Sequence, residues 1–170
     1  MVKRFLTMMA AVTLASAASA KDYNVSSPDG RLAVTVSTGN HIEWSLKADG
    51  RQIVTPSAIS MTLTDGTVWG GPAKVSKVSK YNVNETLPAI LYRSSSVTDS
   101  HNSMVLKFKG GWSLEFRIFN DGVAYRFASE AREEYEIASE QAEINVPAVQ
   151  KVFTPYVKGK KGEIRAKERL

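Results

Sequence analysis

The strongest constraint on how this chain can fold is a two-residue alternation of apolar and polar side chains. The alternation occupies residues 32–36, 42–46, 59–63, 104–108 and 112–118. Successive side chains of a β-strand point to opposite faces, so each segment predicts a strand with one buried face and one face in water. Antiparallel sheets that cover a core from one side have this property.

Turn-forming residues separate the predicted strands. They are Ser27-Pro28-Asp29-Gly30, Asp49-Gly50, Asp65-Gly66, Gly110-Gly111 and Asn120-Asp121-Gly122. The triplet 120–122 predicts a hairpin, because Asn, Asp and Gly tolerate the positive φ angles that tight reversals between twisted strands need. Strands and turns at this spacing are typical of sandwiches and barrels. We predict an all-β protein, folded as an antiparallel β-sandwich.

The segment 129–143 is ambiguous. Ala131, Tyr135, Ala138 and Ala142 follow helical spacing, and Glu and Ala favour helix. The segment nevertheless lies between a predicted hairpin and an extended stretch of an all-β chain, so helix and extended chain both remain open. Its six glutamates match no ion-binding loop, and we expect a solvated acidic face instead of a calcium or acid–base site.

The first twenty residues have the features of a cleavable export signal. Lys3 and Arg4 precede an apolar run, and Ala18-Ser19-Ala20 supplies a small-residue cleavage site. The run is too short to remain as a membrane anchor. We predict residues 1–20 as a signal peptide, with no stable membrane insertion after its removal.

The net charge of +5 comes from the two ends of the chain. Lys3 and Arg4 contribute two positive charges and residues 158–170 contribute a net four, so residues 21–157 carry a net charge of −1. This distribution argues against a nucleic-acid partner. The chain has no cysteine, which excludes disulfides and thiolate chemistry.

Few residues suggest catalysis or metal binding. The two histidines, His41 and His101, are sixty residues apart and show no metal-ligand spacing. The serines of 94–100 lack a nucleophile elbow. We therefore predict no catalytic and no metal-ligating residue. Tryptophan is the side chain best suited to stack on a sugar, and Trp44 and Trp112 lie on apolar strand faces. Trp69, in a turn-like context, remains a weak carbohydrate-contact candidate.

The segment WSLEFRIFNDGVAYRF, residues 112–127, resembles the strand–turn–strand signature of the N-terminal domain of glycoside hydrolase family 97. Residues 27–36 are similar to that family's first strand, and residues 152–156 to its segment after the acidic stretch. The residues that carry the resemblance are Pro28, Asp29, Gly30, Trp112, Asn120, Asp121, Gly122, Arg126, Pro155 and Tyr156. We expect structural roles for them.

The resemblance implies a mutarotase-like β-sandwich that precedes a catalytic (β/α)₈ barrel. The family's enzymes are exported, calcium-dependent α-glucosidases or α-galactosidases of Bacteroides-type bacteria. Their catalytic carboxylates lie on the barrel, so we expect no catalysis by this chain and carry over no calcium ligand or cofactor. We expect residues 21–157 to form the domain, in the periplasm or at the surface of a Gram-negative cell. The implied partners are an α-linked glycan or the catalytic barrel.

The resemblance weakens after Tyr156. Residues 158–170 read as a basic tail, which a frameshift or premature stop would produce, although a natural tail that docks on an anionic surface is the alternative. An incomplete sandwich exposes unpaired strand edges, so we expect marginal folding or aggregation of the isolated chain. Two other functions stay open: a free-standing exported module that binds sugar or a partner, and a surface adhesin with a basic tail.

Overall fold

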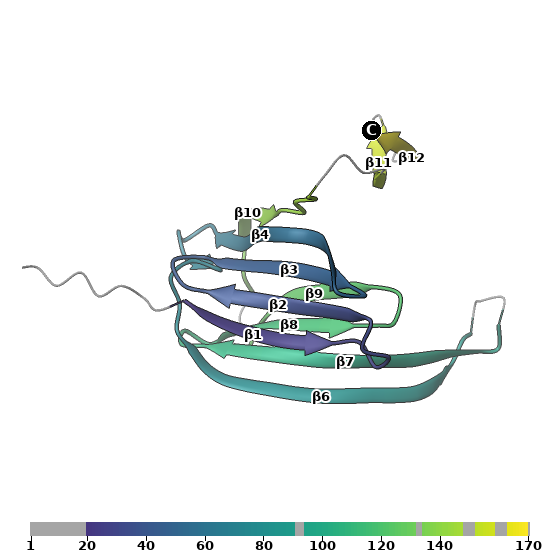
Figure 1. Cartoon of the computed structure of the whole chain (residues 1–170). Helices are drawn as coiled ribbons and strands as arrows, with labels where there is room; N and C mark the ends of the chain where they lie inside the picture. The colour runs from purple at the N-terminus through teal and green to yellow at the C-terminus, as the bar shows by residue number, and fades with distance from the viewer. Residues whose placement is uncertain (1–19, 91–93, 132–133, 148–151, 159–162, 170) are drawn as a thin grey trace, which may run out of the picture.

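A computed structural model describes residues 20–90, 94–131, 134–147, 152–158 and 163–169. The predicted all-β antiparallel fold is confirmed, because the described chain forms two packed antiparallel sheets without helices (Figure 1). The strands are β1 (Lys21–Ser26), β2 (Leu32–Thr38), β3 (Ile42–Ala48), β4 (Arg51–Leu63), β5 (Val68–Trp69), β6 (Val75–Pro88), β7 (Ser96–Phe108), β8 (Trp112–Ile118), β9 (Val123–Ser129), β10 (Ile137–Ala142), β11 (Val152–Lys158) and β12 (Glu163–Arg169). No helix in these ranges is long and apolar enough to cross a membrane.

The first sheet has the order β1-β2-β3-β4-β10, with the short β5 also paired to β4. The second sheet has the order β6-β7-β8-β9 and lies against the first (Figure 1). Strands β6 and β7 are long, and their far ends pair with each other beyond the end of β8. They form a two-stranded ribbon that projects from the sandwich (Figure 1).

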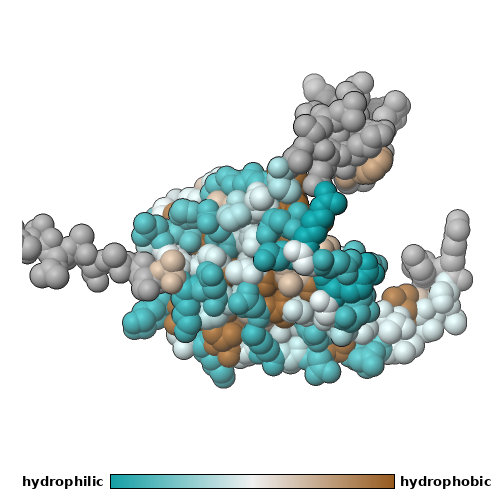
Figure 2. Space-filling model, in the orientation of Figure 1, coloured by the Kyte–Doolittle hydropathy of each residue, from teal (hydrophilic) through white to brown (hydrophobic). Residues whose placement is uncertain are grey.

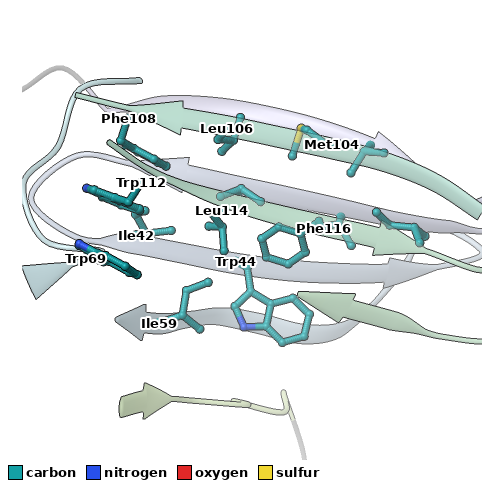
Figure 3. Close-up of a cluster of buried hydrophobic side chains, with 14 of the residues drawn as sticks. Ile42, Trp44, Ile59, Trp69, Met104, Leu106, Phe108, Trp112, Leu114 and Phe116 are labelled. Carbon is teal, nitrogen blue, oxygen red and sulfur yellow. The ribbon is translucent and has the colours of Figure 1, made fainter. Parts of the chain in front are cut away.

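The core lies between the two sheets and is built from the alternating residues. Those of β2, β7 and β8 point inward, and Val34, Leu106 and Phe116 have no exposed surface (Figure 3). The residues between them on the strands face outward, and Figure 2 shows a mostly hydrophilic surface with small apolar patches. Burial of one side of each strand explains why the two-residue period predicts these strands correctly.

An aromatic stack closes one end of the core (Figure 3). The rings of Phe108 and Trp112 lie 4.0 Å apart and nearly parallel, and Trp69 stacks on the other side of Trp112 at 6.0 Å. The edge of Tyr135 meets the Trp69 ring at 5.3 Å. Trp69, the weak carbohydrate-contact candidate, is only 7% exposed, so its ring is buried in the structure. Trp112 therefore covers a face of the Trp69 ring on which a sugar would have to stack.

The ambiguous segment 129–143 contains a strand. Residues 137–142 form β10, which pairs with the edge of β4, and the helical interpretation is wrong for them. Backbone hydrogen bonds to β4 outweigh the local preference of Glu and Ala for helix, because tertiary context overrides propensity. Glu136 and Glu140 are exposed, as a solvated acidic face requires. Part of the ambiguous segment, residues 132–133, lies outside the described residues.

The hairpin predicted at residues 120–122 is present. Strands β8 and β9 pair from Ile118 and Val123 outward, and the amide of Phe119 donates to the carbonyl oxygen of Gly122 at 2.8 Å. The turn closes without a positive φ angle at any of residues 120–122. The hairpin was therefore predicted correctly, but the backbone conformation offered as its cause was not.

Gly70 is a position where a side chain cannot be accommodated. Its φ angle is +102°, and an added Cβ would lie 2.5 Å from the carbonyl oxygen of Ile59. We expect Gly70→Ala to lower the free energy of unfolding by about 3 kcal/mol, from left-handed strain and overlap with rigid backbone. Gly30→Ala is the matched control, because φ is +76° there but the space is open. Equal urea midpoints for the two variants would contradict the steric part of this prediction.

The segment expected as a basic tail pairs as a strand. Strands β11 and β12 form a separate two-stranded antiparallel sheet, in which Pro155 lies opposite Ala166 and Tyr156 opposite Arg165. Residues 163–169 of this segment are thus described as a strand. The segment between the two strands, 159–162, lies outside the described residues.

Candidate functional site

Two of the turns that carry the family resemblance meet in space. The side-chain oxygen of Asn120 accepts a hydrogen bond from the amide of Asp29 at 3.1 Å, across 91 positions of the sequence. The Asp29 carboxylate accepts from the Ser27 hydroxyl at 2.5 Å and from the amide of Arg31 at 3.1 Å. These bonds, with that from Ser27 first, hold the pKa of Asp29 below its usual value. The contact fastens a turn of the first sheet to a turn of the second.

A buried carboxylate lies at the centre of the outer face of the second sheet. Glu115 is 5% exposed. Its oxygens accept hydrogen bonds from the Tyr81 hydroxyl at 2.8 Å, from Nε of Arg117 at 3.0 Å and from the Arg126 guanidinium at 2.6 Å. Three strands, β6, β8 and β9, thus supply the groups that surround one negative charge. We call these four residues the Glu115 cluster.

The electrostatics of the Glu115 cluster make Glu115 a poor proton donor. Burial raises the pKa of Glu115, but the hydrogen bonds from Tyr81, Arg117 and Arg126 together outweigh burial and hold the pKa below its usual value. A carboxyl that must protonate a leaving group needs a raised pKa instead. The carboxylate therefore orients the two arginines, which line a hollow of about 210 Å³ together with Tyr125.

His101 is another buried polar group of the outer face. It is 1% exposed, its Nδ1 lies 2.6 Å from a carboxylate oxygen of Asp99, and its ring packs on Phe119 with centroids 4.8 Å apart. Within the described residues, Nε2 of His101 has no hydrogen-bond partner. A nucleophilic relay needs a hydroxyl at that nitrogen, so the pair does not form one. The same residues contain no group of three or more candidate metal ligands.

Sequence reasoning missed the Glu115 cluster, although a signal was present. With a two-residue turn at 120–121, the hairpin register places Glu115 opposite Arg126, and the structure has this register. Arg117 follows on the same face of β8, because side chains two positions apart share a face. Tyr81 could not be found in this way, because the loop between β6 and β7 does not define their register.

The remaining residues of the family resemblance have different positions. Trp112 is in the core, Asp121 and Gly122 are in the hairpin turn, and Pro28 and Gly30 are in the turn before β2. Arg126 belongs to the Glu115 cluster, whereas Pro155 and Tyr156 are in β11. The structure thus brings the turn of Pro28, Asp29 and Gly30 against the turn of Asn120, Asp121 and Gly122. The other four residues lie elsewhere in the fold.

A polar groove lies between the free edge of β1 and the overhanging strand β6. It has a volume of about 430 Å³. Its lining includes Asn24, Ser26, Lys80, Asn82 and Asn102. Strand β1 is the edge strand of the first sheet, and it lies against β7 of the second sheet. Strand β6 is the next strand after β7 and the edge of the second sheet, so no strand of the first sheet lies opposite it.

Comparison with known proteins places this fold in a family. The glycosyl-hydrolase 97 N-terminal family matches residues 25–169. A retaining alpha-galactosidase of Bacteroides thetaiotaomicron is 40% identical over 160 residues, which are 94% of this chain and 24% of that protein. The chain thus spans about a quarter of the length of this relative.

Solved structures share the fold at lower identity. A glycoside hydrolase family 97 enzyme from Pseudoalteromonas sp. strain K8, in complex with panose, matches with a TM-score of 0.64 and 22% identity over 74% of this chain and 20% of its own. A beta-arabinopyranosidase matches with a TM-score of 0.72 and 18% identity over 86% of this chain and 26% of its own.

The family match changes one expectation. It continues to residue 169 and so includes nearly all of 158–170, where we expected the family pattern to end. Strand β12 therefore lies within the family match. The chain belongs to the glycosyl-hydrolase 97 N-terminal family.

Proposed function

We propose that this chain is the non-catalytic, carbohydrate-associated N-terminal β-sandwich of an exported α-glycosidase. The observation that carries the proposal is the 40% identity to a retaining alpha-galactosidase over 94% of this chain. Its partners are then the catalytic barrel of such an enzyme and an α-linked glycan. The signal-like first twenty residues support export to the periplasm or cell surface.

The chemistry of the described residues supports a non-catalytic role. Glycoside hydrolysis uses two placed carboxyl groups, one of which must exchange a proton with the leaving group. Among the described residues, Glu115 is the one carboxylate with a buried side chain, and its three donors hold it in the ionised form. Such a carboxylate positions its neighbours and does not transfer protons.

A domain exchange tests this proposal. The 160 aligned residues of the Bacteroides thetaiotaomicron alpha-galactosidase are replaced by the matching residues of this chain. We expect the chimera to hydrolyse an aryl α-galactoside with kcat/KM within about tenfold of the parent, a loss of at most about 1.4 kcal/mol in transition-state stabilisation. We expect no hydrolysis above buffer by this chain alone.

The controls separate folding from function. The parent without the exchanged segment shows what the enzyme loses when no N-terminal sandwich is present. Circular dichroism and the elution volume report whether the chimera is folded. A folded but inactive chimera, or α-galactoside hydrolysis by this chain alone, would overturn the proposal.

A further inference from the structure

The groove between β1 and β6 is open to solvent, and its lining is mostly polar, with Val25 and Tyr81 as the exceptions. Lys80 and Asn82 of β6 are exposed, as is Asn24 of β1, while Asn102 of β7 is half-buried. In Figure 1 strand β6 is the outermost strand of the second sheet and lies to the outside of β1.

The hydrogen bonds inside the groove leave donors and acceptors unused. Nδ2 of Asn102 donates to the carbonyl oxygen of Ser26 at 2.9 Å, which leaves its Oδ1 available. Oδ1 of Asn24 accepts from the Thr35 hydroxyl at 2.6 Å, which leaves its Nδ2 available. Within the described part of the chain, Lys80 and Asn82 make no side-chain hydrogen bond. The groove thus offers amide donors, an amide acceptor and an ammonium group side by side.

This set of groups selects a class of ligand. Each hydroxyl of a sugar donates and accepts, and an amide side chain can match two neighbouring hydroxyls because it carries both functions. No carboxylate lines the groove, which disfavours a metal cation. Lys80 is the single charged lining residue, and one ammonium group is too little for a polyanion. The volume of about 430 Å³ is within the range of small-molecule sites.

We propose that this groove binds a neutral saccharide of one or two rings, with Asn82 and Lys80 as direct contacts and with Asn24 and Asn102 held in place by their own hydrogen bonds. The site is non-catalytic. This inference rests on the proposed carbohydrate association and adds its place in the fold. An open groove with few aromatic contacts gives weak binding, so millimolar saccharide is the appropriate test concentration.

The test measures saccharide binding to the full chain by ¹H–¹⁵N NMR titration with melibiose and with maltose. The variant is the double substitution Lys80→Ala and Asn82→Ala, at two exposed positions with no intramolecular side-chain bonds to lose. The matched control is Lys77→Ala with Asn84→Ala, which removes the same residue types from β6 outside the lining. We expect the groove variant to bind at least about tenfold more weakly and the control to bind like the parent chain.

Three results decide between the possibilities. A selective loss of affinity in the groove variant supports the site. Equal binding by the groove variant and the parent chain overturns the site, while carbohydrate association stands. If neither saccharide shifts a resonance of the folded parent chain, the groove assignment fails. The domain exchange then decides separately whether the role in an α-glycosidase stands.

Discussion

Replacing Trp112 with alanine should lower the free energy of unfolding by about 4 kcal/mol, the range found for buried aromatic residues. The indole is 5% exposed and lies between the rings of Phe108 and Trp69, so its removal leaves a cavity and ends two stacking contacts. Flanking strands on two sheets hold these rings, and the cavity cannot collapse without moving a sheet. Urea unfolding followed by circular dichroism measures the change.

Two other variants calibrate the result. Trp112→Phe keeps an aromatic ring in the stack and should cost less than half as much as Trp112→Ala. Tyr135→Ala removes a ring that is 40% exposed at the end of the stack, and we expect about 1 kcal/mol. A urea midpoint for Trp112→Ala that equals that of Tyr135→Ala would show that the stack does not organise this end of the core.

Replacing Glu115 with alanine should cost about 3 kcal/mol, because it leaves Tyr81, Arg117 and Arg126 without the group that they share. Loss of one partner from a buried ion pair is costly since an uncompensated charge remains. Such a loss costs about 3–5 kcal/mol in general. Both arginines can turn toward water, so we expect a cost at the lower end of this range. The control is Glu130→Gln, which breaks an exposed ion pair with Lys107 and should cost less than about 1 kcal/mol.

The same carboxylate gives the fold a pH dependence. The pKa of Glu115 is lower in the folded chain than the ordinary value of 4.5. Its ionised form therefore stabilises the fold above that value, and the contribution is lost as the pH falls through the folded pKa. We expect thermal stability to fall below about pH 5 and to fall less steeply in Glu115→Gln. The pKa values of Asp29, Asp49 and Asp65 are also lowered, so part of the slope should remain in the variant.

The sequence predicted what depends on local order. Alternating residues such as Leu32 to Val36 define the buried face of a strand by themselves, and the triplet 120–122 defines a hairpin between its neighbours. The features that the sequence left open depend on partners that are distant in the chain. Residues 137–142 have the composition of a helix, but the unpaired edge of β4, more than seventy positions earlier, makes them a strand. Trp69 has the context of an exposed turn residue, but Trp112 covers its ring.

The candidate sites follow the same division. The pairing of Glu115 with Arg126 is contained in one hairpin, and its register could have been counted from the turn. The polar groove depends on how far one sheet overhangs the other, which no local pattern encodes. Its residues, for example Asn24 and Asn82, come from different sheets and show no motif in the sequence.

The order of the strands has a consequence for how the chain folds. Within the first sheet β1 to β4 are neighbours in the chain as well as in space, and the same is true of β6 to β9 in the second sheet. Each set can therefore form by successive hairpins, which close short loops in microseconds. Strand β10 alone among the described strands of these two sheets must reach back past the whole second sheet to find β4. We expect that sheets form early and independently, and that the slow event is the meeting of two preformed apolar surfaces, followed by the late addition of β10.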